Sequence, residues 1–430
     1  MLGRIGNLAL WLLALLLIVI AVNSNEPYLL KLRGARHVVL IAATIIVPIV
    51  MIGRGAWRSG MARRLLFIAW CVPLPAFIAS QSVSAVRKYE TLHADAATAR
   101  LLGRHFVVGY DDPAEASMLA GRGLIAGVYV TGHNAAGRTA AELKAELAGL
   151  QAPRAAAGLP PLIVAADQEG GSVAHLSPLL PAEPALSSFA TLPPDRRSRE
   201  AVAYGRRQGA DLASIGVTLN LAPVLDLRPS WQRNRFDFNT LISRRAISED
   251  PAIVSDIALP YVRGLETAGV GAAVKHFPGL GRVRADTHHF AATLDTPVAE
   301  LEARDWRPFR DVLSNSRAAL MVGHVALTAV DPDRPASHSK AVLGHLIRRQ
   351  WNYQGVIITD DLVMGAIYGG DVCKAVVEAL NGGADLLLVA YDGTQFYRVF
   401  GCARHALERG ELDLAMLRAS EARLQRWSGE

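Results

Sequence analysis

The stretch Val356-Ile-Ile-Thr-Asp360-Asp361-Leu-Val-Met364 joins a short apolar, β-branched run directly to two carboxylates. Such a run is typical of a buried strand. Runs of this kind recur with segments of helical pattern between them, and they cover 105–108, 125–130, 162–166, 218–221, 272–274, 319–322, 356–358 and 386–389. Strands that alternate with helices predict parallel βαβ units. Eight units over about 330 residues predict an α/β fold, a (β/α)8 barrel of the TIM type.

Ionisable residues follow several of these runs at the point where the strand should end. Asp167 follows the third run, Lys275 and His276 the fifth, His324 the sixth and Asp360 the seventh. Because the loops after the strands build the active site of such a barrel, we expect these side chains to meet there. A doubly wound sheet is the alternative fold, but no glycine-rich fingerprint follows an early strand.

The first ninety residues have a different composition. Three apolar runs predict transmembrane helices at about 7–23, 37–53 and 65–85, since a hydrocarbon core needs roughly 20 apolar residues. We therefore expect a membrane anchor over 1–88 and a catalytic domain over 95–430. A cleaved signal peptide is the alternative for the first run, and the two runs that follow it argue against cleavage.

Basic residues in the short loops predict the orientation of this anchor. Arg54, Arg58, Arg63 and Arg64 make the second loop more basic than the first, which holds Lys31, Arg33 and Arg36. We expect an inside N-terminus and three crossings of a bacterial inner (plasma) membrane. This multi-pass topology would place the catalytic domain in the periplasm or outside the cell.

The composition argues against a disordered chain, a nucleic-acid-binding protein and a cysteine-based metal site. With 51% hydrophobic residues, the 430-residue chain is not intrinsically disordered. The formal charge of +6 is concentrated in arginines beside the apolar runs, which favours membrane topology over nucleic-acid binding. Cys71, Cys373 and Cys402 have no metal-type spacing. Cys373 with Cys402 is the pairing that we consider, but we expect both to be free thiols.

The two neighbouring carboxylates should have different roles. Side chains of adjacent strand residues point to opposite faces, so Asp360 and Asp361 cannot both face one substrate atom. We expect Asp360 to face the barrel mouth and Asp361 to bond into the following loop or helix start. An ordinary helix N-cap is the alternative interpretation of Asp361.

The loop after the fifth run carries an Asp-x-His pair, Asp286 and His288. A carboxylate beside a histidine suits general acid–base work, although a loop histidine is commonly just a solvated side chain. A buried, satisfied pair is the alternative interpretation of Lys275 and His276. A zinc or two-metal site is a further alternative, with ligands drawn from His276, Asp286, His288, His289, His324 and Asp360. The first strand lacks the His-x-His pair of metal-dependent barrel hydrolases, so we expect no metal.

Five segments together resemble the family 3 glycoside hydrolases, in their single-domain β-N-acetylhexosaminidase branch. They are Asp167-Gln-Glu-Gly-Gly-Ser-Val, Leu221-Ala-Pro-Val-Leu-Asp-Leu227, Lys275-His-Phe-Pro-Gly-Leu-Gly, Ala285-Asp-Thr-His288 and Thr359-Asp-Asp-Leu-Val-Met364. The resemblance implies a nucleophile at Asp360 and an acid/base at His288, with Asp286 as its partner. It also implies sugar-binding roles for Asp167, Arg245, Lys275 and His276.

The resemblance implies double displacement with net retention through a covalent glycosyl-enzyme, without a cofactor. We expect an exo-β-N-acetylglucosaminidase that acts on peptidoglycan glycan or muropeptide fragments. Phosphate in place of water as the acceptor is a further hypothesis, because neutral imidazole repels anions less than a carboxylate does.

Two positions depart from the family pattern. His175 stands where the family usually carries arginine, and Leu280 stands where it usually carries histidine. We expect His175 to contact substrate, and both departures bear on substrate choice. The alternatives are a family 3 β-glucosidase or β-xylosidase, and a catalytically quiet membrane-anchored protein that binds glycan.

Overall fold

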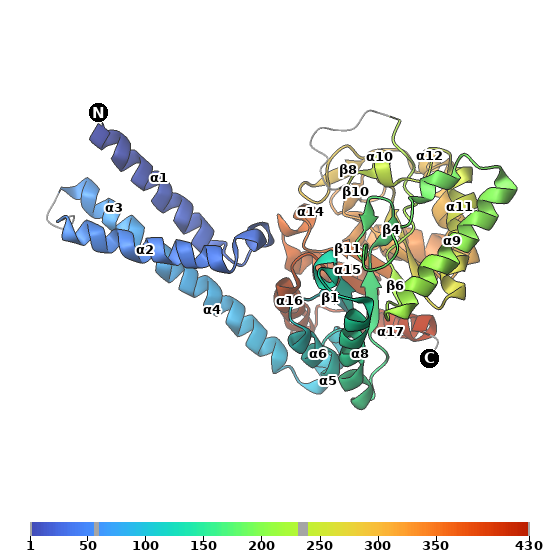
Figure 1. The fold of residues 1–430 in the computed structure, drawn as a ribbon, viewed down its shortest axis with the longest axis horizontal. Helices are drawn as coiled ribbons and strands as arrows, with labels where there is room; N and C mark the ends of the chain where they lie inside the picture. Colours follow the sequence, from blue (N-terminus) through green and yellow to red (C-terminus); the bar gives the residue numbers. More distant parts are fainter. Residues whose placement is uncertain (1, 56–59, 231–239, 429–430) are drawn as a thin grey trace. The chain divides into compact units, whose positions relative to one another are not determined.

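The computed structural model describes residues 2–55, 60–230 and 240–428, which form two compact units (Figure 1). The first unit spans Met1–His93 and the second spans Ala94–Glu430. Arg58, which the topology argument used, lies outside the described residues.

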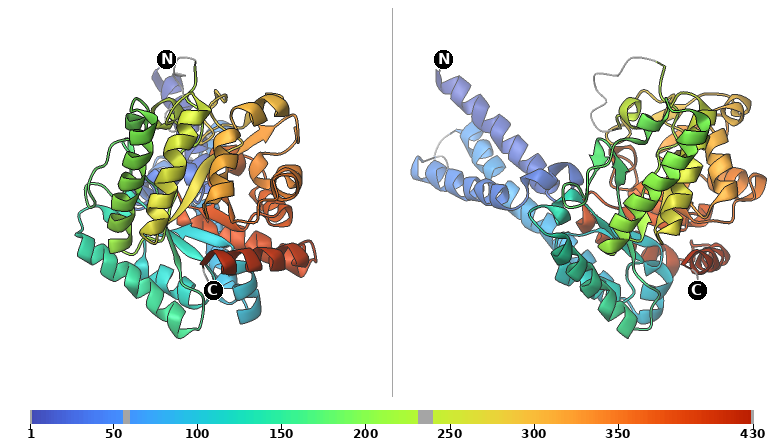
Figure 2. Two further views of the ribbon diagram at one scale, coloured as in Figure 1. Left: turned by 90° about the vertical axis from the view of Figure 1, so that its right-hand side faces the viewer. Right: turned by 45° about the vertical axis from the view of Figure 1, so that its right-hand side comes forward.

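The second unit is built around a closed barrel of parallel strands (Figures 1 and 2). Around the barrel the order is β1-β12-β11-β9-β7-β6-β3-β2. In chain order the strands are β1 (Phe106–Gly109), β2 (Gly127–Val130), β3 (Ile163–Ala166), β6 (Leu219–Asn220), β7 (Gly271–Phe277), β9 (Ala319–Val322), β11 (Ile357–Asp361) and β12 (Leu386–Val389). The (β/α)8 prediction is confirmed, and the doubly wound alternative is wrong.

Each predicted run corresponds to one strand, but two strands are longer than their runs. Lys275 and His276 belong to β7, and Asp360 and Asp361 belong to β11, instead of following them. An apolar run in the sequence ends at the first polar side chain, whereas the hydrogen-bonded pairing of the strand with its neighbours continues beyond that residue. Phe277 still pairs with Val322, and Asp361 pairs with Leu388.

Helices cover the outside of the barrel, and α9 and α11 lie side by side there (Figure 2). The helices of this unit are α5 (Ala96–Gly103), α6 (Pro113–Gly121), α7 (Gly132–Ala135), α8 (Ala140–Ala156), α9 (Pro194–Ser214), α10 (Ile242–Arg245), α11 (Pro251–Thr267), α12 (Val298–Ala303), α13 (Arg307–Asn315), the π-helix η5 (Ala341–Gln350), α14 (Gly365–Tyr368), α15 (Val372–Gly382), α16 (Phe396–Glu408) and α17 (Leu414–Ser428). Several begin at an acidic or hydroxyl N-cap: the Asp112, Thr139, Asp250 and Asp371 side chains each accept a backbone N–H.

The barrel interior is apolar. Side chains such as Val107, Leu219, Met321 and Ile358 form one buried cluster, against which Trp427 of α17 packs. Two small sheets lie outside the barrel, one of β4 (Gln168–Gly170) with β5 (Val173–Ala174), the other of β8 (Ala292–Leu294) with β10 (Val325–Leu327). Both are formed by chain that leaves the C-terminal ends of β3, β7 and β9, so they belong to the loops around the expected active site.

The N-terminal unit is helical, with α1 (Leu2–Val22), the short 3-10 helix η1 (Pro27–Leu32), α2 (Ala35–Gly53), α3 (Met61–Cys71) and α4 (Pro73–Leu92). Ala14 and Leu17 of α1 pack with Leu66 and Trp70 of α3. Among the described residues, one stretch, Met61–Leu92, is long and apolar enough to cross a membrane.

The described residues therefore support one candidate membrane span and not the three that the sequence predicts. The helices α1 and α2 have 21 and 19 residues, but within the described residues their apolar stretches, Asn7–Val22 and Ile41–Gly53, fall short of the roughly 20 residues that a hydrocarbon core needs. The orientation argument assumed three crossings, and it loses its support with them. The multi-pass location in an inner membrane loses its support for the same reason.

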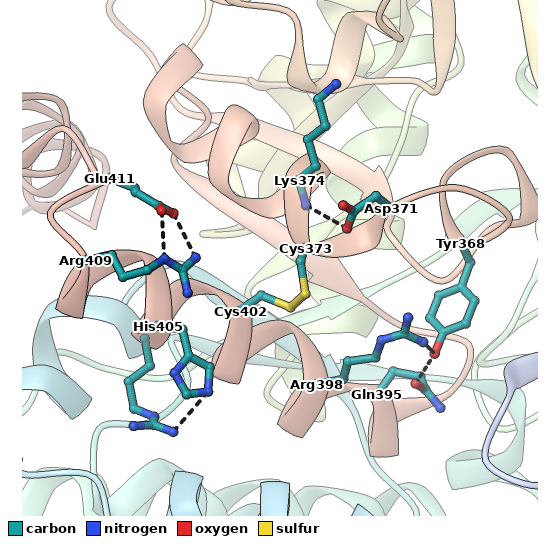
Figure 3. Close-up of a disulfide and its surroundings, with 11 residues drawn as sticks. Tyr368, Asp371, Cys373, Lys374, Gln395, Arg398, Cys402, His405, Arg409 and Glu411 are labelled. Carbon is teal, nitrogen blue, oxygen red and sulfur yellow. Dashed lines mark hydrogen bonds and ion pairs between the residues drawn. A yellow bond between two sulfur atoms is a disulfide. The ribbon is translucent and has the colours of Figure 1, made fainter. Parts of the chain in front are cut away.

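The second unit contains a disulfide between Cys373 of α15 and Cys402 of α16 (Figure 3). The expectation of free thiols at these positions is wrong, because the helices that follow β11 and β12 bring two cysteines 29 residues apart in sequence into contact. Cys71 is free and exposed.

Candidate active site

Two adjacent carboxylates end β11, and their surroundings differ as expected. Asp361 is buried and accepts the backbone N–H groups of Val363, Ala390 and Tyr391, so it ties the end of β11 to the chain after β12. Burial raises the pKa of Asp361 to about 6. Asp360 is only half-buried and accepts the N–H of Asp361 at 2.9 Å.

Asp360 lies among three imidazoles. Burial by itself would raise the pKa of Asp360, but its interactions with the imidazoles of His276, His324 and His288 hold that pKa below its usual value. Asp360 is therefore ionised at this end of the barrel. A carboxylate kept ionised and partly accessible can act as a nucleophile.

His288 and Asp286 form the pair that the sequence predicts. The Nδ1 atom of His288 lies 3.0 Å from Oδ1 of Asp286, and the same oxygen accepts the Thr240 hydroxyl at 2.9 Å. Asp286 is buried, which would raise its pKa, but the hydrogen bonds from His288 and Thr240 lower it. The Nδ1 proton of His288 is thus held by a carboxylate, and Nε2 remains for proton exchange. The His288 side chain is 38% exposed, so a substrate can reach it.

Four charged side chains form a buried network at the ends of β3 and β7. Lys275 pairs with Asp167 and with Glu169, the latter at 2.7 Å. Arg245 of α10 binds Glu169 through two nitrogens, at 2.6 and 3.0 Å. Burial would raise the pKa values of both carboxyls, but Lys275 and Arg245 hold them below their usual range, that of Glu169 at about 2. The network fixes the charged heads in place, which suits binding of sugar hydroxyls.

His276 is held by a second buried carboxylate. Its Nδ1 lies 2.6 Å from Oδ2 of Asp226, and its Nε2 lies 3.3 Å from Nη2 of Arg245. An arginine nitrogen can only donate, so Nε2 accepts and the Nδ1 proton is donated to Asp226. Asp226 also accepts the N–H of Leu280 at 2.6 Å, which ties the loop after β7 to this site.

His324 is hydrogen-bonded to the backbone at the end of β11. Its Nε2 lies 2.9 Å from the carbonyl oxygen of Asp361, and its Nδ1 lies 2.8 Å from the Ser337 hydroxyl. A carbonyl accepts only, so Nε2 carries the proton. Burial lowers the pKa of His324, which keeps this arrangement neutral.

The two departures from the family pattern have different surroundings. His175 Nδ1 lies 3.1 Å from the Tyr129 hydroxyl, which donates to Asp167 at 2.6 Å. His175 therefore reaches the charged network through Tyr129. Leu280 is buried, so its side chain contributes to packing.

The structure brings the predicted residues into one site at the C-terminal end of the barrel. Sequence reasoning gave no role to Glu169, Asp226, Tyr129 or Thr240. Glu169 and Asp226 lie inside two of the segments that resemble the family, so their position was a usable signal. No such signal pointed to Tyr129 and Thr240, because only folding brings these residues close to the other site residues. No three His, Cys, Asp or Glu side chains of the described residues are grouped as a metal site.

Comparison with known proteins agrees with this geometry. The model of the glycosyl hydrolase family 3 N-terminal domain matches residues 87–427. A curated β-hexosaminidase of Xanthomonas campestris is 35% identical over 271 residues, which are 62% of this chain and 77% of that protein. A β-N-acetylhexosaminidase structure from Beutenbergia cavernae is 26% identical, with a TM-score of 0.68, over 79% of this chain and 100% of that one.

A family 3 β-N-acetylglucosaminidase structure from Paenibacillus is 28% identical, with a TM-score of 0.69. The match covers 77% of this chain, which spans 62% of that longer chain. The barrel, the charged network at its C-terminal end and a family match over more than half of the sequence lead to one conclusion: this chain belongs to family 3 of the glycosyl hydrolases.

Proposed function

We propose that this glycoside hydrolase is a retaining exo-β-N-acetylglucosaminidase. One observation carries the proposal: ionised Asp360 lies within electrostatic reach of His288, whose Nδ1 is bonded to buried Asp286. The similarity to β-hexosaminidases supports the choice of sugar.

In the first step, Asp360 attacks the anomeric carbon while protonated His288 gives its proton to the glycosidic oxygen. The bond to the leaving group breaks, and a covalent glycosyl-enzyme forms. In the second step, His288 takes a proton from water, which displaces Asp360 from the anomeric carbon. Asp286 stabilises the imidazolium form of His288, and two displacements leave the configuration unchanged.

The terminal sugar lies against the charged network. Asp167, Lys275 and Arg245 bind its hydroxyl groups, together with His276. The strong ion pairs among these side chains support this assignment, because they fix the donors and acceptors before the substrate arrives. His175 contacts the same sugar from a position beside Tyr129, whose hydroxyl lies 3.1 Å from its Nδ1.

The natural substrate is a cell-wall glycan or a muropeptide fragment with terminal β-linked N-acetylglucosamine, and the enzyme works outside the cytoplasm. The Cys373–Cys402 disulfide supports this location, since disulfides persist in oxidising compartments. The stretch Met61–Leu92 is the candidate attachment to a membrane. Exposed apolar side chains on α1 and α2, such as Leu12, Leu16, Ile46 and Ile49, suit an apolar environment.

The test measures release of a chromophore from an aryl β-N-acetylglucosaminide by the full chain. We expect Asp360→Ala to abolish turnover, and His288→Ala to reduce it by about 10²- to 10⁴-fold. His405→Ala, at an exposed position on α16, and Asp295→Asn, at an exposed position after β8, are the matched controls. Azide is small enough to replace the missing carboxylate, so it should restore turnover in Asp360→Ala and yield a glycosyl azide of inverted configuration.

Turnover of β-glucoside or β-xyloside instead would contradict the choice of sugar. Glycan binding without turnover of any of the three substrates would favour the alternative of a glycan-binding protein without catalytic activity. For location, a reporter fused after residue 430 should be active only in a form that requires export. Activity of a reporter that works in the cytoplasm would refute the proposed location.

A further inference from the structure

A cavity of about 360 Å³ lies at the N-terminal end of the barrel, away from the site described above. Its lining includes Ala318, which directly precedes β9, and Gly355, two residues before β11 begins. The candidate active site is built on the opposite ends of these same strands. The cavity is therefore separate from the glycosidase chemistry.

Arginines from three parts of the fold line this cavity. Arg310 comes from α13, Arg317 from the segment before β9, and Arg423 and Arg426 from α17. Its lining contains two tryptophans, Trp351 and Trp427, and no aspartate or glutamate. Four guanidinium groups around one cavity create a strongly positive potential.

Little of this charge is neutralised within the described part of the protein. Arg423 is buried and pairs with Asp385 at 2.8 Å, yet its Nη2 has no hydrogen-bond partner among the described residues. Asp385 is already shared, because it also pairs with Arg348 and accepts the Ser420 hydroxyl. The single negative charge of Asp385 is thus shared between the guanidinium groups of Arg348 and Arg423.

The other three arginines make no ion pair with the described residues. Arg317 bonds the carbonyl oxygens of Arg426 and Trp427 at 3.4 and 2.9 Å, contacts that leave its charge in place. The nearby carboxylate of Glu266 accepts the backbone N–H of Arg317 and not its guanidinium. Arg310 lies over the ring of Trp351, 5.9 Å from its centroid. Arg310 and Arg426 are both exposed, so a ligand from solution can reach them.

We propose that this cavity is a binding site for a phosphate group, carried by a small phosphomonoester or by free inorganic phosphate. A carboxylate is planar and is satisfied by one bidentate arginine. A phosphate carries more negative charge and three strongly accepting oxygens that point in different directions. That geometry matches guanidinium groups that reach the cavity from separate elements.

The test is calorimetric titration of the full chain with inorganic phosphate and with glucose 6-phosphate, at constant ionic strength. We expect both to bind, and the double variant Arg310→Gln/Arg426→Gln to lose about tenfold or more in affinity for each. Tighter binding of glucose 6-phosphate identifies the phosphomonoester as the preferred source, whereas equal affinities identify the bare phosphate group as sufficient.

The matched control is Arg307→Gln/Arg418→Gln, which removes the same charge from the same two helices at positions that do not line the cavity. It should keep the affinity of the parent. Because the active site could also bind phosphate, each titration is repeated with saturating N-acetylglucosamine, which should not displace the ligand. Absence of binding by the parent, equal loss in both double variants, or displacement by N-acetylglucosamine would each overturn the proposal. Thermal unfolding of both double variants verifies that they fold.

Discussion

His276 donates its Nδ1 proton to Asp226 across 2.6 Å, and both side chains are buried. His276 lies close enough to Asp360 to influence the pKa of that carboxyl. Asp226 therefore acts on the proposed nucleophile through His276, as a positioning residue.

We expect Asp226→Asn to lower kcat by about tenfold to a hundredfold, since one charge-assisted hydrogen bond contributes about 1.5–3 kcal/mol. The amide can donate where the carboxylate only accepts, so His276 loses its fixed orientation. The measurement is kcat and KM on an aryl β-N-acetylglucosaminide, with exposed Asp295→Asn as the control. An unchanged kcat with intact thermal stability would show that Asp226 has no part in positioning.

Tyr129→Phe should raise KM by about tenfold with a smaller change in kcat. The variant removes the hydroxyl that donates to Asp167 at 2.6 Å and contacts His175 at 3.1 Å. One lost hydrogen bond to a charged group corresponds to about one factor of ten in affinity. Steady-state kinetics of Tyr129→Phe and His175→Ala test this. If His175 acts only through Tyr129, the double variant should be no weaker than Tyr129→Phe alone.

The Glu169 carboxyl should make the stability of the barrel depend on acid pH. Its pKa is held at about 2 in the folded chain against an ordinary value of 4.5, so the folded state favours the ionised form. That stabilisation is complete above about pH 4.5 and is lost as pH falls towards 2; it amounts to at most about 3 kcal/mol.

Denaturant unfolding of the full chain over this pH range checks the prediction, with Glu169→Gln as the comparison. The variant should be less stable than the parent at neutral pH, because it leaves Lys275 and Arg245 without one buried partner. It should also lose less stability on acidification. Parallel pH profiles for the two proteins would contradict the assignment.

Removal of the disulfide should destabilise the catalytic unit by about 3–4 kcal/mol, as the chain-entropy relation gives for a loop of 29 residues. Cys373→Ser/Cys402→Ser should unfold at lower denaturant concentration than the parent, and a reductant should move the parent towards the variant. Cys71→Ser is the control, because that thiol is free. Insensitivity of the parent to a reductant that cleaves the bond would contradict a stabilising role.

Local pattern was sufficient for the barrel and for the position of Asp360, because β11 ends in two carboxylates that the fold must place at the mouth. Asp286 and His288 were placed there too, since they lie in the loop that follows β7. Local pattern did not identify the partners of Glu169 and Thr240, because these partners, Arg245 and Asp286, lie 76 and 46 residues away. Only the closure of the barrel brings these side chains together.

The N-terminal prediction of three spans is supported at one of them, Met61–Leu92, which is a single apolar stretch of 32 residues. Among the described residues the other two apolar stretches, Asn7–Val22 and Ile41–Gly53, are too short to count as candidates. The cysteine prediction failed because Cys373 and Cys402 are 29 positions apart in sequence, and local pattern does not show that α15 and α16 are neighbours.

The Cys373–Cys402 bond encloses β12, one of the barrel strands, in a covalent ring. A protease that nicked the chain anywhere between Ala375 and Gly401 would leave two fragments still joined through sulfur. The cut protein would migrate as one species on a non-reducing gel and as two after reduction. The chain could thus be cut once between α15 and α16 without losing the strand that closes its barrel.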